Sequence, residues 1–179
     1  YSHLGNAFQE IGKFNYAINS YKKALSINSS NPEVHYNLGI AFHNLGQFDK
    51  SLSSFRQAIL LRPIYPEAYC NQGICHKENG HFDLALLSYQ QAIKINPNYK
   101  DALYNLGFLK LLCGDYITGW VGFELRPDKL LISIPFKNNI NRWKGEKLKK
   151  GEKLLVVSEQ GLGDTIQYMR YIPYLREKG

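Results

Sequence analysis

The chain is organised around two rows of glycine residues that repeat every 34 residues. The first row contains Gly5, Gly39, Gly73 and Gly107, and the second contains Gly12, Gly46, Gly80 and Gly114. A period of this length indicates stacked helical hairpins, which bury their apolar faces against neighbouring hairpins instead of closing around one core. We therefore predict an all-α solenoid of four helical hairpins over residues 1–125.

The two rows predict different structural roles. A glycine inside a helix costs about 1 kcal/mol relative to alanine, so the first row indicates points where two helices approach too closely for a side chain. The second row falls where the first helix of each hairpin must stop and turn, and glycine commonly ends a helix. An aromatic residue follows each of these turns, and we expect it to fill the gap between the two helices: Phe14, Phe48, Phe82 and Tyr116.

The same register sets the expected helix boundaries. We predict helices over about 2–12, 15–28, 33–45, 49–62, 67–79, 83–96, 101–113 and 116–124. Pro32 suits the first turn of its helix, whereas Pro63 and Pro97 end theirs because proline cannot continue the hydrogen-bond ladder. The expected units are 1–30, 31–64, 65–98 and a degenerate 99–125, in which Gly119, Trp120 and Gly122 replace the usual small and aliphatic residues.

Two short motifs carry a family resemblance. Asn37-Leu38-Gly39 and Asn105-Leu106-Gly107 fall in first helices, and an Ala-Ile pair precedes both Pro63 and Pro97. In this pattern residues 1–125 resemble the tetratricopeptide repeat family. The resemblance implies stacked helix pairs whose first helices line a concave groove.

One expected groove position is asparagine in three successive units: Asn37, Asn71 and Asn105. A side-chain amide carries both a donor and an acceptor, so such a ladder can hold the backbone of an extended peptide. It is similar to the ladder of the protein O-GlcNAc transferases, which implies a protein or peptide partner. Tyr36 and Tyr104 fall beside it. The alternative is that asparagine is only a common consensus residue of this repeat.

Charge is unevenly distributed along the chain. Residues 1–125 contain ten Lys or Arg and nine Asp or Glu, whereas residues 126–179 contain twelve and six. The nearly neutral repeats argue against a nucleic-acid-binding face, which needs a basic stripe. The sequence shows neither a signal peptide nor an apolar run of the roughly 18–20 residues that span a bilayer. Three cysteines are too few and too irregular for a disulfide framework, so we predict a cytoplasmic protein.

Cysteine and histidine gather in the third unit without forming a recognisable metal motif. The spacing of Cys70, Cys75, His76 and His81 matches no common zinc pattern, so we predict no metal site. By their register, Cys75 and Cys113 are expected at core positions, where a thiol acts as a small hydrophobe.

The periodicity stops after residue 125. We interpret residues 126–151 as a connector and residues 152–179 as a truncated, Rossmann-like α/β start. An apolar run, Leu154 to Val157, is typical of a buried parallel strand, and a glycine turn and a helical pattern follow it. Because a lone strand–turn–helix has no strand to pair with, we expect the chain to be a fragment of a longer protein.

A wider set of residues supports a second resemblance. The set is Gly114-Asp115-Tyr116, Gly119-Trp120, Glu124, Arg126, Trp143, Gly145, Glu159 to Gln167 and Arg170 to Pro173. It looks like bacterial proteins that join tetratricopeptide repeats to a glycosyltransferase domain similar to the lipopolysaccharide heptosyltransferases, which have two Rossmann-like lobes.

That resemblance implies roles for the glycine turn. Asp164 would be the general base on a saccharide or polypeptide acceptor hydroxyl, with Gln160, Gly161 and Gly163 binding substrate. A nucleotide-sugar donor is implied for the longer protein, and no cofactor for this fragment. From the residues alone, Asp164 can equally be a helix N-cap.

Two functions of different class stay open. In one, the repeats hold an acceptor or a partner for a glycosyltransferase. In the other, the protein is a pure protein–protein interaction scaffold without transferase activity. In both, we expect the fragment itself not to be catalytic, because one strand–turn–helix element cannot form an active site.

Overall fold

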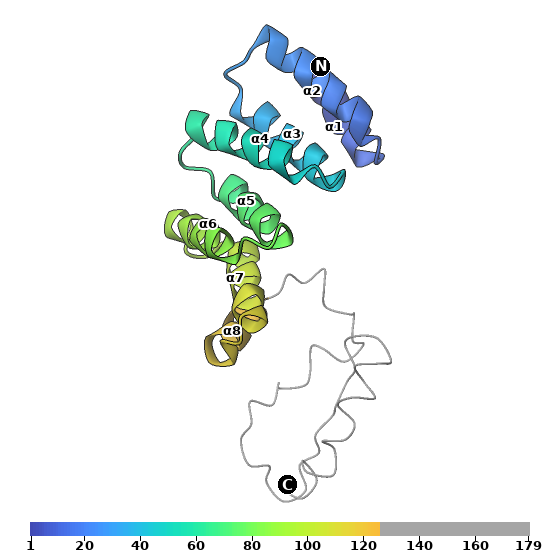
Figure 1. Ribbon diagram of the computed structural model, residues 1–179. Helices are drawn as coiled ribbons and strands as arrows, with labels where there is room; N and C mark the ends of the chain where they lie inside the picture. Colours follow the sequence, from blue (N-terminus) through green and yellow to red (C-terminus); the bar gives the residue numbers. More distant parts are fainter. Residues whose placement is uncertain (126–179) are drawn as a thin grey trace, which may run out of the picture. The chain divides into compact units, whose positions relative to one another are not determined.

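The computed structural model describes residues 1–125, which form four antiparallel helix pairs (Figure 1). The helices are α1 (Ser2–Glu10), α2 (Phe14–Ile27), α3 (Pro32–Asn44), α4 (Phe48–Leu61), α5 (Pro66–Glu78), α6 (Phe82–Ile95), α7 (Lys100–Leu112) and α8 (Tyr116–Phe123). The predicted bounds are confirmed to within two residues at every helix end. The connector and the strand–turn–helix expected over residues 126–179 lie outside the described residues.

The second glycine row ends the first helix of each pair in the same way. Gly12, Gly46, Gly80 and Gly114 have φ values of 73°, 68°, 77° and 88°. In the second turn, the Gly46 N–H donates to the carbonyl of His43 at 2.8 Å, and the Gln47 N–H donates to the carbonyl of Phe42 at 3.0 Å. This pair of bonds is the Schellman motif, which requires a left-handed residue. Glycine is needed here for its conformation, since a Cβ would meet nothing within 4 Å.

The first glycine row lies against aromatic rings of the second helices. A Cβ added to Gly39 would lie 2.6 Å from the Phe55 ring, and one added to Gly73 would lie 2.5 Å from the Tyr89 ring. Tyr21 packs on Gly5 in the same way. The prediction of close helix approach at these glycines is confirmed.

The prediction of the gap-filling aromatic was correct only in part: Phe14 and Phe48 are half-buried, and Phe48 packs against the cluster that contains Phe55. Phe82 and Tyr116, two of the residues expected to fill the gap, are 39% and 63% exposed, whereas Tyr21, Phe55 and Tyr89 are 1% exposed or less. The expected residues begin the second helices, beside the solvated turn. A residue two helical turns further along lies opposite the glycine, where the helices cross.

The fourth pair closes more tightly than the others. A Cβ on Gly107 would meet the backbone of Gly122 and Phe123, at 2.6 and 2.5 Å, instead of a ring. A Cβ on Gly122 would in turn lie 2.7 Å from the carbonyl oxygen of Leu103. The unusual glycines of α8 therefore allow backbone-to-backbone contact with α7.

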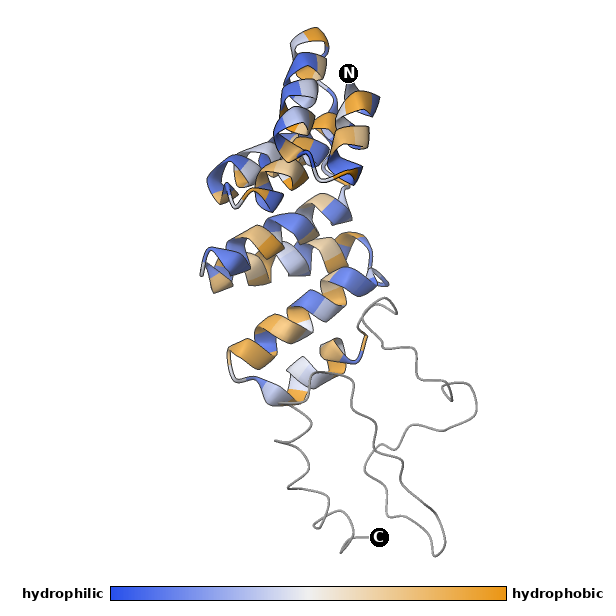
Figure 2. Ribbon diagram, turned by 90° about the vertical axis from the view of Figure 1, so that its right-hand side faces the viewer, coloured by the Kyte–Doolittle hydropathy of each residue, from blue (hydrophilic) through white to orange (hydrophobic). Residues whose placement is uncertain are grey.

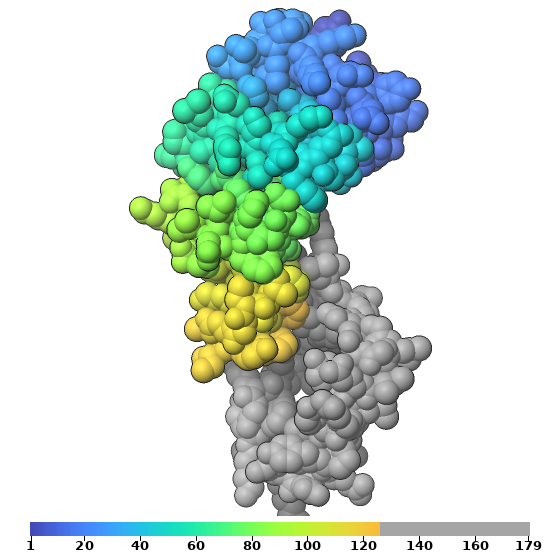
Figure 3. Space-filling model, viewed as in Figure 1, coloured from blue at the N-terminus to red at the C-terminus, as the bar shows by residue number. Residues whose placement is uncertain are grey.

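The pairs stack in chain order (Figure 3). Each second helix packs on the first helix of the next pair, and the first helices α1, α3, α5 and α7 also contact one another in sequence. Successive second helices make no comparable contacts within residues 1–125. The stack therefore curves toward its first helices, whose joint surface we call the inner wall.

Each helix carries both hydrophobic and hydrophilic residues (Figure 2), and the apolar ones pack between pairs. One cluster joins α2 to α3 and another joins α5 and α6 to α7. Among the helices of residues 1–125, none combines the length and apolarity that a membrane crossing requires.

Candidate functional site

Three helices of the inner wall carry the same pattern of residue types. An acidic residue is followed by asparagine four residues later and by an apolar residue three residues after that. The sets are Glu33, Asn37 and Ile40 on α3, Glu67, Asn71 and Ile74 on α5, and Asp101, Asn105 and Phe108 on α7. Because positions i, i+4 and i+7 share one helix face, each set forms a line along its helix. We call these nine residues the inner stripe.

Hydrogen bonds from the asparagines cross from one inner helix to the preceding one. Asn37 Nδ2 donates to Asn6 Oδ1 at 3.1 Å, and Asn71 Nδ2 donates to the Tyr36 hydroxyl at 2.8 Å. Asn105 Nδ2 contacts Cys70 Sγ at 3.8 Å and donates to the Asp101 carbonyl at 2.8 Å. The ladder thus lies where successive inner helices meet.

The ladder presents acceptors more than donors. Each of the three amide groups already donates within the repeats, but no hydrogen bond reaches any of their side-chain oxygens within residues 1–125. All three side chains are half-buried. Their oxygens are open to a ligand, as is the second N–H of Asn37 and of Asn71 within residues 1–125.

The two tyrosines expected in the groove also pack between helices. The Tyr36 ring centroid lies 5.0 Å from that of Tyr65 and 5.8 Å from that of Phe55, and burial raises the pKa of its hydroxyl. The Tyr104 ring lies 5.4 Å from the Phe123 ring. Both are half-buried, so each supports the wall in addition to lying on it.

The acidic residues form a row that the sequence analysis missed. Glu33, Glu67 and Asp101 are exposed in the first turn of α3, α5 and α7, and we call them the acidic edge. The signal was present, because they repeat at the same 34-residue step as the glycines. Asp101 lies near Cys70, whose thiol pKa is raised to about 12 by burial first and by this negative charge second.

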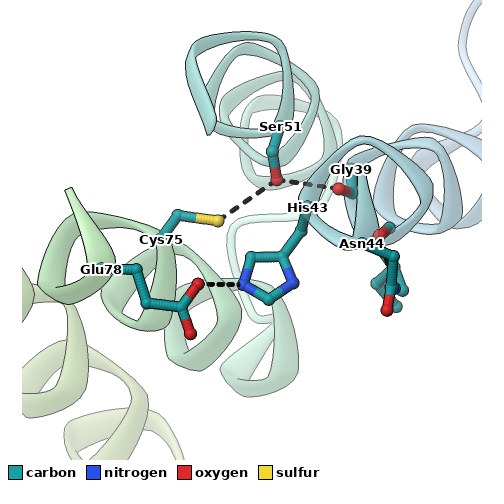
Figure 4. A network of polar contacts seen from close by, with 7 residues as sticks. Gly39, His43, Asn44, Ser51, Cys75 and Glu78 are labelled. Carbon is teal, nitrogen blue, oxygen red and sulfur yellow. Dashed lines mark hydrogen bonds and ion pairs between the residues drawn. The ribbon is translucent and has the colours of Figure 1, made fainter. Parts of the chain in front are cut away.

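A histidine and a lysine lie toward the opposite ends of the inner helices. His43 Nε2 lies 2.8 Å from Glu78 Oε2 and links α3 to α5 (Figure 4). The Lys77 ammonium lies 5.1 Å from the centre of the Phe108 ring. Across the described wall, the acidic edge and these two side chains therefore occupy different rows.

The cysteines have structural surroundings. Ser51 Oγ donates to the Gly39 carbonyl at 2.8 Å and lies 3.2 Å from Cys75 Sγ (Figure 4). Cys75 is buried as predicted, and burial raises its pKa to about 11. The prediction that Cys113 is a core residue is wrong, because it caps α7 at the solvated turn and is exposed. No group of three or more His, Cys, Asp or Glu within residues 1–125 is placed to hold a metal ion.

Family comparisons decide what this stack is. One family model, described as TPR repeat, matches residues 5–46, and two described as tetratricopeptide repeat match residues 32–65, 66–99 and 88–120. Together they span residues 5–120. The chain is a tetratricopeptide repeat protein. No curated protein matches its sequence.

Solved structures share the fold of this tetratricopeptide repeat protein. A crystal structure of MamA has a TM-score of 0.65 at 27% identity over 69% of this chain and 72% of that one. The first TPR of Spaghetti (RPAP3), bound to an HSP90 peptide, has a TM-score of 0.61 at 24% identity over 63% and 90%. The Sgt2 TPR domain from Aspergillus fumigatus has the same TM-score and identity over 64% and 77%.

The residues that were expected to bind substrate are not part of the inner wall described above. Gln160, Gly161, Gly163 and Asp164 fall outside both the described residues and the segments that the family models match. Their roles stay predictions.

Proposed function

We propose that the repeats bind an extended polypeptide along the inner wall. The observation that carries this proposal is the asparagine ladder, whose side-chain oxygens lie on successive inner helices without a partner in residues 1–125. An extended peptide leaves its backbone N–H groups unpaired. Acceptors repeated along the wall can receive them whatever the peptide's side chains are.

The apolar residues at one end of the inner stripe add apolar contact. Ile40 and Ile74 are half-buried, and Phe108 is 38% exposed. A row of apolar groups beside a few fixed polar ones is the usual composition of a binding site. The RPAP3 domain that shares this fold is bound to the peptide SRMEEVD, so a stack of this size has room for a short peptide.

The test is peptide selection followed by ladder substitution. Peptides are first selected from a display library on the full chain. Their affinity is expected to fall about tenfold when Asn71 and Asn105 are both changed to alanine, because each lost hydrogen bond between uncharged groups costs about 0.5–1.5 kcal/mol. Asn15→Ala and Asn19→Ala remove exposed asparagines of α2 and serve as the matched control. Failure to select any peptide, or equal losses in both pairs, would contradict the proposal.

For the tail, we propose the opening of a glycosyltransferase lobe in a longer, cytoplasmic protein. Support comes from the run Gln160-Gly161-Leu162-Gly163-Asp164 after an apolar stretch and from the resemblance described above. Asp164 acts as base toward the acceptor hydroxyl, and Gln160, Gly161 and Gly163 lie near the substrate. A nucleotide sugar is the donor.

Nucleotide release tests this second proposal. The longer protein, incubated with a panel of nucleotide sugars, is expected to release nucleotide, and Asp164→Asn is expected to abolish the release without loss of folding. Absence of release with every donor would favour the scaffold alternative.

A further inference from the structure

The acidic edge gives the inner wall a charge preference. Glu33, Glu67 and Asp101 each occupy the second position of their helices and lie one helical turn before an asparagine of the ladder. Positions four residues apart share a helix face. The carboxylates therefore run beside the ladder, one on each successive inner helix.

First-turn carboxylates also occur in the outer helices, where helix stability accounts for them. A carboxylate in the first turn is favourable because it complements the helix dipole, and Asp49 and Asp83 occupy the same second position in the outer helices α4 and α6. These two aspartates provide a control with the same local role and a different location.

One member of the acidic edge forms an ion pair, and two form none within residues 1–125. Glu33 pairs with Arg62 at 2.9 Å, and both side chains are exposed, so the pair is weak. Glu67 and Asp101 have no ion-pair partner within residues 1–125. Lys77 lies over the Phe108 ring, and Lys110 donates to Thr118. The pKa of the Arg62 guanidinium is raised first by its hydrogen bond to Glu33 and also by the negative charge of Glu67, so Arg62 is the cation that acts on both carboxylates.

Most of the hydrogen-bonding capacity that the acidic edge and the ladder offer is therefore on oxygen atoms. Carboxylates of the acidic edge and amide oxygens of the ladder accept hydrogen bonds and attract positive charge. A complementary ligand has to bring N–H donors and cations.

We infer that the polypeptide bound by this wall is basic, with lysine or arginine at every third residue. This inference rests on the proposed function. Packed helices lie about 8–10 Å apart, and we apply this spacing to α3, α5 and α7 because successive members of this set contact one another. A polyproline II chain turns once in three residues and rises about 3.1 Å per residue, so every third side chain faces the same way about 9 Å further on. Successive cations then meet successive carboxylates. A β-strand fits less well, because its same-face side chains lie about 6–7 Å apart.

A suitable probe exists in the sequence itself. Lysines occur at every third position in one segment: Lys144, Lys147, Lys150 and Lys153. A synthetic, fluorescently labelled peptide that copies residues 143–154 has the required spacing. The segment also contains Lys149, so the receptor is the full chain with all five lysines changed to glutamine, which prevents its own segment from competing.

Fluorescence anisotropy compares this probe with three other peptides. One has the same composition with its lysines moved out of the three-residue register, one has glutamine in place of lysine, and one is SRMEEVD, whose last four residues include three acidic side chains. The probe is expected to bind about tenfold more tightly than the register-changed copy, and SRMEEVD is expected not to bind, because like charges repel across an interface. Affinity is expected to fall as salt rises from about 50 to about 500 mM.

Matched substitutions locate the effect. Glu67→Gln with Asp101→Asn is expected to weaken the probe about tenfold and to leave the glutamine copy unchanged, whereas Asp49→Asn with Asp83→Asn is expected to change neither. If all peptides bind equally, or both pairs of variants behave alike, the charge inference is overturned while peptide binding stands. If no peptide binds here or in the library selection, the proposed function fails with it.

Discussion

The ring of Tyr89 lies so close to the backbone of Gly73 that an added Cβ would be 2.5 Å from it. This contact holds the two helices of the third hairpin together, and Tyr89 is fully buried in it. We expect Gly73→Ala to destabilise the protein by about 1–2 kcal/mol, because overpacking of about 1–3 kcal/mol outweighs a gain of up to about 1 kcal/mol in helix propensity. Chemical denaturation measures the difference. Adding Tyr89→Leu is expected to cost less in the alanine background than in the parent, and strictly additive effects would contradict this account.

Glycine is required in the turns for its backbone conformation and not for its small size. Gly46 has a φ of 68°, and a Cβ added to it would meet nothing within 4 Å. We expect Gly46→Ala to cost about 1 kcal/mol from left-handed strain and Gly46→Asn to cost less, because asparagine tolerates this conformation. The free energy of unfolding of both variants is measured by thermal or urea unfolding. Equal losses of stability would mean that glycine is required here by lack of space and not by its positive φ.

Acidification is expected to weaken the third hairpin through His76. This side chain is 5% exposed with no partner for Nδ1. Burial, followed by the charges of Arg56 and His81, lowers its pKa below the usual 6.5. The unfolded chain then binds the proton more readily than the folded one, so stability falls as the pH drops below about 6.5.

The preceding unit supplies the variant that tests this dependence. Phe42 occupies the position equivalent to His76 and is also buried. His76→Phe is expected to flatten the decline of unfolding free energy between about pH 7 and pH 5, whereas His81→Gln, at an exposed position, is expected to retain most of it. An unchanged slope in His76→Phe would assign the dependence to other groups.

The last hairpin exposes apolar residues where the first two units are polar. Ile117 is 88% exposed and Val121 is 69% exposed, and the equivalent residues of the first unit are Asn15 and Asn19. Ile117→Asn with Val121→Asn is expected to reduce binding of a hydrophobic dye while changing stability by less than about 0.5 kcal/mol, as exposed positions usually do. A larger loss of stability would indicate that this face is packed.

The 34-residue period was enough to predict the helices and turns because each unit repeats the same local chemistry. The period did not predict which row of aromatic residues packs against the glycines. Residues at equivalent positions of the units lie on the same helix face, but the period does not show whether that face is turned toward the partner helix. Tyr116 and Cys113 were misplaced for related reasons, since both sit at the solvated turn.

The candidate site was predicted only in part. The asparagines were found by their period, but Asn6, which accepts from Asn37, lies outside that phase and depends on three-dimensional packing. To predict the acidic edge, the 34-residue period has to be combined with the geometry of the helices. Residues 126–179 contain no sequence repeat against which the positions predicted there could be checked.

The most direct test of peptide binding follows the ladder amides themselves. In an NMR titration of the full chain with a library-selected peptide, the side-chain amide resonances of Asn71 and Asn105 are expected to shift, while those of Asn15 and Asn19 on α2 stay in place. Shifts confined to the outer helices, or no shifts at saturating peptide, would contradict binding along the inner wall.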